Sequence, residues 1–299
     1  MTPNRPEKSQ SSLSVSLKKL IDVRRKSQIC TRDESRYCQE RTIVKRRIKS
    51  MLALALFSPS LSWAACDVQS GPKATALIEL YTSEGCSSCP PADKRLSQFP
   101  SGDYGLAQAV PISLHVDYWD DLGWKEPFAQ AQFSERQSWL VHANGHKTVF
   151  TPHFFVSGTE VRDWRSDLAD ALKRVNAQPA GADIHLRSEA GAQGAFVVSA
   201  SASAPASAES AALFIAVTED KLTSRVSAGE NRGATLSHDH VVRQWIGPIA
   251  LRAGHADVRQ AITPRTNWNS TNLGIVGFVQ DMKTGHVLQA VAASECVRS

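Results

Sequence analysis

The stretch Ala76–Asp93, ALIELYTSEGCSSCPPAD, joins an apolar run, a short polar turn, two cysteines in C-x-x-C spacing and a proline pair. The apolar run predicts a buried strand, and prolines fit the first turn of a helix. This order is typical of a strand that delivers a dithiol to a helix N-terminus. A C-x-x-C pair alone fits redox chemistry, metal binding or a structural disulfide. The choice between these interpretations therefore depends on the pattern of strands and helices in the rest of the chain.

The charges and the N-terminal pattern predict an exported protein. The whole chain carries a net charge of +5, but residues 1–50 contain 14 Lys and Arg against 5 Asp and Glu, which leaves −4 for the remainder. A mildly acidic body without a basic cluster indicates no nucleic-acid partner. The basic run 45–49, the apolar run 51–57 and the small residues around Trp63 are typical of a secretory signal peptide cleaved after Ala64.

We therefore expect residues 1–64 to be a disordered basic extension plus the signal peptide, and the mature protein to be periplasmic or secreted. The apolar run is too short to form a permanent membrane span.

Export would leave four cysteines in a compartment that permits disulfides. If Cys86 and Cys89 pair locally, Cys66 and Cys296 near the two ends of the mature chain are the natural partners of a structural disulfide. In the chain-entropy model, closing so long a loop would be worth roughly 5 kcal/mol. The alternative is a lipidated Cys66, but Trp63 stands where lipoprotein cleavage sites usually carry Leu.

Periodicity along the mature chain predicts two domains. Residues 65–178 follow the order β-α-β-α-β-β-α, which is the minimal thioredoxin frame, with strands expected at 74–82, 109–116, 154–157 and 160–163, and helices at 86–98, 128–143 and 166–177. Beyond residue 181, alternating apolar residues predict strands at 183–187, 195–201, 213–218, 225–228 and 240–245, and a hairpin over 275–290. We expect an α/β fold, in which a thioredoxin-like domain precedes an antiparallel β-rich, sandwich-like domain over residues 182–299.

The dithiol is the main candidate catalytic site. The thiolate is the nucleophile in disulfide exchange, and a helix N-terminus lowers a thiol pKa. We therefore assign Cys86 as the attacking nucleophile and Cys89 as the resolving cysteine. Glu79 lies in the apolar strand ahead of them, where burial would raise its pKa and let it accept the proton of the resolving thiol. A solvent-facing Glu79 is the alternative.

Two further segments are candidates for substrate binding. Thr151, Pro152 and His153 open a buried-looking strand, and a cis bond between Thr151 and Pro152 would present the Thr151 backbone to a bound peptide, whereas a trans bond is the common form. The loop after the second predicted strand lies where ligands bind in open α/β sheets. Its candidate residues are Asp117, Tyr118, Trp119 and Trp124, and a packed aromatic cap is the alternative interpretation.

Several blocks of the chain resemble one known family. ELYTSEGCSSCPPADKRL, HVDYWDDLGW and TPHFFVSG are similar to the three blocks of the secreted thioredoxin-like family catalogued as domain of unknown function 1223, and AGENRGATLSHDHVVR resembles its second-domain block. The resemblance covers nearly everything after Gly71. It implies a thioredoxin-like domain with a redox dithiol at Cys86 and Cys89, Pro152 near it, and an appended β-rich domain. The chain departs from the family at His153-Phe154, where Gln and Met are more usual.

These observations predict a thiol-disulfide oxidoreductase that acts on protein thiols or disulfides and needs no cofactor. The first alternative is a copper- or zinc-handling protein, in which His153 joins the two cysteines as a ligand. The second is a non-enzymatic binding module with a structural C-x-x-C. We predict no resident metal.

Overall fold

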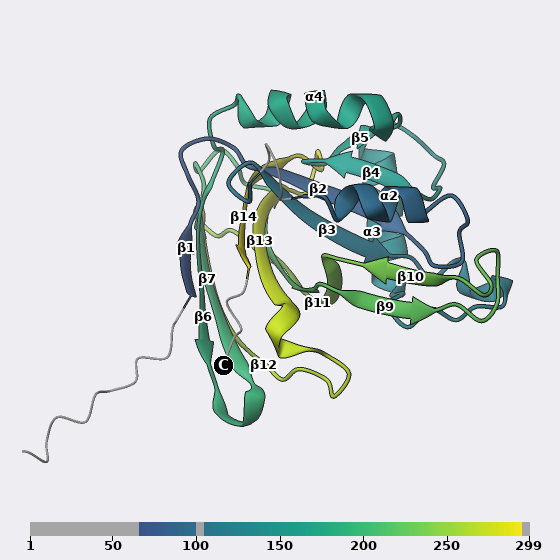
Figure 1. The fold of residues 1–299 in the computed structure, drawn as a ribbon. Coiled ribbons are helices and arrows are strands. Elements are labelled where there is room, and N and C mark those ends of the chain that lie inside the picture. Colours follow the sequence, from purple (N-terminus) through teal and green to yellow (C-terminus); the bar gives the residue numbers. More distant parts are fainter. Residues whose placement is uncertain (1–65, 100–104, 295–299) are drawn as a thin grey trace, which may run out of the picture. The chain divides into compact units, whose positions relative to one another are not determined.

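The computed structural model describes residues 66–99 and 105–294 (Figure 1). The predicted signal peptide and Cys296 lie outside these residues. Within the described part, three α-helices accompany three β-sheets: α2 (Pro90–Leu96), α3 (Ala131–Ala143) and α4 (Trp164–Asn176). Short 3-10 helices are η1 (Asp120–Leu122), η2 (Ala192–Gly194) and η3 (Ser270–Asn272).

The largest sheet has eight strands and joins segments from both halves of the chain. Its strand order is β14 (Val287–Ser294), β13 (Leu273–Asp281), β8 (Ala211–Glu219), β11 (Val241–Ala250), β3 (Ala109–His115), β2 (Ala76–Thr82), β4 (His153–Val156) and β5 (Thr159–Val161). A four-stranded sheet has the order β1 (Cys66–Gln69), β6 (Asp183–Ala190), β7 (Phe196–Ser203) and β12 (His255–Ile262). The strands β9 (Leu222–Arg225) and β10 (Thr235–His238) form a separate hairpin.

The predicted fold class, an α/β thioredoxin-like domain followed by a separate antiparallel sandwich-like domain, is wrong. The described chain is a β-rich fold whose large sheet is mixed, with parallel pairs β2–β3 and β3–β11 among antiparallel ones. The physical reason is that β11 pairs with β3 at Val241 and Ser113, so strands expected in a second domain continue the first sheet. Strands from residues 76–161 and from residues 211–294 therefore share one sheet.

Alternation along β2 places its side chains in two different apolar clusters. Leu77 and Tyr81 pack with α3, whereas Ile78 and Leu80 pack with α2 and α4. Such alternation is the normal consequence of a strand, in which successive side chains point to opposite faces. A third cluster lies between the four-stranded sheet and strands β8 and β13. The face of β2 that a residue occupies thus decides which helix it meets.

The order of elements brings the dithiol to the carboxyl end of β2. The chain leaves this strand at Thr82, turns through residues 83–88 and enters α2 at Pro90. Two prolines stand at the first two helical positions, where a missing N–H costs no hydrogen bond.

In the described residues, no helix is both long and apolar enough to cross a membrane.

Candidate functional site

Cys86 and Cys89 are both reduced, and both are buried, with 1% and 0% of their surfaces exposed. Cys89 is the N-cap of α2, and its N–H donates to the Cys86 carbonyl at 3.2 Å. The N–H of Cys86 donates to the carbonyl of Ser83, which closes the preceding turn. Ser87 and Ser88 between the cysteines are exposed. The dithiol is thus reached from solvent beside these two serines.

The environment of Cys86 favours its thiolate. The pKa of Cys86 is lowered from its ordinary value of 9.0 to about 6, first because the Cys89 thiol donates a hydrogen bond to its sulfur. Burial opposes this shift, and hydrogen bonds from the side-chain hydroxyls of Ser88 and Thr151 add to it. The Oγ of Ser88 lies 3.2 Å from the Sγ of Cys86. Cys86 therefore has the properties of an attacking thiolate.

The environment of Cys89 favours its thiol. Burial raises the pKa of Cys89 well above its ordinary value, and the neighbouring Cys86 and Asp93 raise it further. A thiol of this kind keeps its proton until a base removes it. The low pKa of Cys86 therefore suits an attacking cysteine, and the high pKa of Cys89 suits a resolving cysteine.

Thr151 and Pro152 lie next to the dithiol, and the peptide bond between them is cis. The carbonyl oxygen of Thr151 lies 3.7 Å from Cys86 Sγ and 3.5 Å from Ser88 Oγ. The indole Nε1–H of Trp119 donates to Thr151 Oγ1 at 2.8 Å. The structure therefore brings these predicted site residues together, and Trp119 acts by holding Thr151.

The other residues of the predicted substrate loop make internal contacts. Trp124 donates its Nε1–H to the Glu84 carboxylate at 2.8 Å, and Asp117 accepts a hydrogen bond from Ser134. The Tyr118 hydroxyl donates to Gln137 Oε1 at 3.2 Å, and the residue is 38% exposed. Trp119 and Trp124 are half-buried, so Tyr118 is the most exposed of these three aromatic residues. Burial raises the pKa of Tyr118, and the nearby Cys89 and Cys86 raise it further.

His153 is fully buried, and both of its ring nitrogens are occupied. Its Nε2 lies 3.0 Å from Glu160, and its Nδ1 accepts from the Gln137 side chain at 3.2 Å. Burial lowers its pKa, against the opposing effect of Glu160, and so favours the neutral ring. Among residues 66–99 and 105–294, no three His, Cys, Asp or Glu side chains are arranged to hold a metal ion. The metal-handling alternative therefore gains no support from His153.

Glu79 is buried as expected, but its contacts are not with the dithiol. Its Oε1 accepts from Arg136 Nε at 2.7 Å and from the Tyr81 hydroxyl at 3.1 Å. It follows the alternation of Leu77 and Tyr81, which face α3, whereas Cys89 begins α2 on the other face of the sheet. The structure thus does not bring Glu79 to the resolving cysteine.

Sequence reasoning missed a second contribution to the site, from the loop between β9 and β10. The Asn231 amide donates to the carbonyls of Glu84 and Cys86 at 2.8 and 2.9 Å, and Glu230 accepts the Ser87 N–H at 2.8 Å. These residues stand inside the block AGENRGATLSHDHVVR, so the only sequence signal for them was the family resemblance. No local pattern predicts a contact across more than 140 residues.

A group of buried acids and histidines behind the dithiol was also missed. His115 is paired with Glu126, and His238 Nε2 lies 3.0 Å from Glu84 Oε1. Asp93, in α2, is buried near them. Polar residues at buried positions of strands and helices are the signal that would have found this group.

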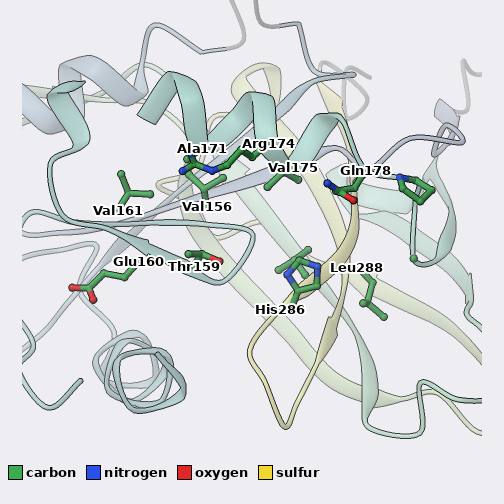
Figure 2. Close-up of a pocket in the computed structure, with 14 residues that line it drawn as sticks. Val156, Thr159, Glu160, Val161, Ala171, Arg174, Val175, Gln178, His286 and Leu288 are labelled. Atoms are coloured by element: carbon green, nitrogen blue, oxygen red, sulfur yellow. The ribbon is translucent and has the colours of Figure 1, made fainter. Parts of the chain in front are cut away.

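A separate hollow of about 390 Å³ lies between α4, β5 and the start of β14 (Figure 2). Arg174, Gln178 and His286 are among its lining side chains, and none of the predicted site residues is. Ala74, at its edge, precedes β2, whereas the dithiol follows the end of that strand. The hollow is therefore at the far end of β2 from Cys86.

The structural disulfide predicted between Cys66 and Cys296 is only partly within the described residues. Cys66 begins β1 and is disulfide-bonded. Cys296 lies outside the described part of the chain, so this pairing stays a prediction.

The fold and the site define a β-rich protein with a reduced, buried C-x-x-C dithiol at the start of a helix. The sequence profile of the family described as "protein of unknown function (DUF1223)" matches residues 77–280. The chain belongs to this family, which confirms the resemblance noted in its sequence blocks. No curated protein is significantly similar to this chain.

Two solved structures are similar in fold. A structural-genomics protein of Agrobacterium tumefaciens has 24% identity and a TM-score of 0.52, over 77% of this chain and 97% of that one. HBP35 of Porphyromonas gingivalis has 15% identity and a TM-score of 0.57, over 75% of this chain and 76% of that one. At these identities the similarity is one of fold alone.

Proposed function

We propose that this chain is an exported thiol-disulfide oxidoreductase that acts on protein disulfides through Cys86 and Cys89. The observation that carries the proposal is the reduced Cys86–Cys89 pair at the start of α2, with the cis Thr151–Pro152 bond beside it and the Thr151 carbonyl oxygen 3.7 Å from Cys86 Sγ. The lowered pKa of Cys86 and the raised pKa of Cys89 agree with the roles of attacking and resolving cysteine. A substrate disulfide would approach the dithiol from the side on which Ser87 and Ser88 are exposed.

In the proposed reaction, the Cys86 thiolate attacks one sulfur of the substrate disulfide. The substrate S–S bond breaks, one substrate thiolate leaves with the electron pair, and a mixed disulfide forms at Cys86. Cys89 then loses its proton and attacks Cys86 Sγ, which releases the second substrate thiolate and leaves the Cys86–Cys89 disulfide. The reverse sequence would oxidise a dithiol substrate, and no cofactor takes part in either direction.

The test is a redox titration of the purified protein at defined glutathione potentials. Thiols are trapped at each potential, and mass spectrometry follows the peptide that contains both cysteines; Cys86→Ser and Cys89→Ser identify the signal. A reversible pair within roughly −120 to −270 mV, the range of known exchange proteins, is the expected result. A potential below about −300 mV would make the pair a structural disulfide and overturn the proposal in favour of a binding module.

A further inference from the structure

Cys89 has no exposed surface, so its proton cannot pass directly to solvent. The proposed reaction nevertheless requires that this thiol lose its proton before it attacks the mixed disulfide. A buried thiol of raised pKa needs a base within the protein. The structure around Cys89 therefore has to contain a proton acceptor if the reaction takes place.

Asp93 is the acid that the structure places next to Cys89. It lies one helical turn further along α2, and its N–H donates to the Cys89 carbonyl at 3.0 Å. Its side chain is buried, with 6% of its surface exposed, and its Oδ1 makes no direct hydrogen bond to a described residue. The hydroxyl of Thr82, at the end of β2, is buried without a hydrogen bond to a described residue, and it lowers the pKa of both Cys89 and Asp93. Asp93 and Cys89 thus share one buried polar environment.

Charged and titratable side chains around Asp93 shift its pKa in both directions. His115 on β3 and His238 on β10 lower its pKa electrostatically, and their rings meet edge to face at a centroid distance of 5.0 Å. The Nε2 of His115 and the Nδ1 of His238 make no hydrogen bond to a described residue. Glu126 also acts on Asp93, in the opposite electrostatic sense to the two histidines. Burial is the largest effect and raises the pKa of Asp93, which makes it a better base than an exposed aspartate.

A groove leads from Asp93 to the surface. It has a volume of about 330 Å³ and lies between α2 and β10, and its lining includes Asp93, Ser97, Thr235 and His238. The groove is lined by neither cysteine, so it is distinct from the side on which Ser87 and Ser88 are exposed. A proton accepted by Asp93 therefore has a way to solvent that a bound substrate would not block.

We propose that Asp93 is the proton acceptor for Cys89 and that the groove between α2 and β10 is the proton's exit to solvent. This inference rests on the proposed function. In the step, the S–H bond of Cys89 breaks and its proton passes to the Asp93 carboxylate. The Cys89 electron pair forms the bond to Cys86 Sγ, and the bond between Cys86 and the substrate breaks with release of the substrate thiolate.

The reduced protein is mixed with the aryl disulfide 5,5′-dithiobis(2-nitrobenzoate) in a stopped-flow instrument, and the coloured aryl thiolate is followed. The first release reports the attack of Cys86, and the second reports resolution by Cys89. Cys86→Ser provides the background from other thiols. We expect Asp93→Asn to leave the first phase unchanged and to slow the second phase by about 100-fold or more. Asp93→Glu is expected to recover part of the rate.

The matched control is Asp170→Asn, the same substitution at an exposed position of α4, which is expected to change neither phase. In the wild-type protein, the second phase is expected to slow with acidification at a pH above the usual aspartate range, because a protonated Asp93 cannot accept a proton. This measurement keeps the test valid even if Asp93→Asn fails to fold. The role of Asp93 would be overturned if the second phase in Asp93→Asn had the wild-type rate. It would also be overturned if the second phase of the wild-type protein did not slow with acidification. Loss of the first phase in the wild type would instead overturn the proposed function.

Discussion

The Nδ2 atom of Asn231 lies 2.9 Å from the carbonyl oxygen of Cys86, a residue 145 positions earlier in the chain. The same amide group donates to the carbonyl of Glu84 at 2.8 Å. Both carbonyls belong to the turn that carries the dithiol. The β9–β10 hairpin is therefore part of the redox site, although it is far from it in the sequence.

Removal of the Asn231 amide should make Cys86 more accessible. In Asn231→Ala the turn loses two hydrogen bonds, each worth about 1 kcal/mol. Because about 1.4 kcal/mol corresponds to a factor of ten, this loss of about 2 kcal/mol should make alkylation of Cys86 by iodoacetamide about 30-fold faster. Arg232→Ala, in the same loop but with an exposed side chain, serves as the control. Equal rates in both variants would show that the hairpin does not restrict access to the dithiol.

The thiolate of Cys86 should appear at an unusually low pH. Its absorbance in the ultraviolet is expected to rise with a midpoint near pH 6, since the thiolate fraction increases as the pH passes upward through the pKa of about 6. In Cys89→Ala the midpoint should move upward toward the ordinary value of 9.0, because the principal hydrogen bond to the thiolate is lost. An unchanged midpoint in this variant would contradict the assigned cause.

The two serines between the cysteines should differ in effect. Ser88 Oγ contacts the Cys86 sulfur, whereas Ser87 interacts with Glu230. A hydrogen bond to a charged group is worth about 1.5–3 kcal/mol, so Ser88→Ala should raise the pKa of Cys86 by about one to two units. Ser87→Ala is the matched control and should leave the pKa of Cys86, measured by the absorbance titration, unchanged. The prediction fails if both alanine variants titrate alike.

The buried pair of Glu79 and Arg136 should contribute to stability. The guanidinium also donates to Gln280 at 2.9 Å and lies over the rings of Phe214, Trp245 and Phe278. Glu79→Gln leaves the buried Arg136 without its counter-charge, and this should lower the free energy of unfolding by about 3–5 kcal/mol in urea denaturation. The double variant with Arg136→Met should lose less, because no charge is left buried alone. A larger loss in the double variant would show that Arg136 stabilises the core independently of Glu79.

Several local elements were predicted from the sequence with small errors at their ends. The strand expected at 74–82 is β2, Ala76–Thr82, and the helix expected at 166–177 is α4, Trp164–Asn176. Strands β1, β10 and β12 were not predicted. These strands contain few apolar residues, so alternation of apolar and polar residues gives little signal there. They form because a neighbouring strand offers its hydrogen bonds.

By itself, the sequence determined the dithiol, its position between a buried strand and a helix, and the family, because these depend on neighbouring residues such as Cys86, Cys89 and Pro90. Only the tertiary structure decided that β11 extends the sheet at β3, and that Glu79 meets Arg136 whereas Asp93 shares the environment of Cys89. The physical reason is that strand pairing and the burial of a charge depend on residues far apart in the chain. A strand's alternation shows that it has two faces, but the helices packed on them decide which face holds the site.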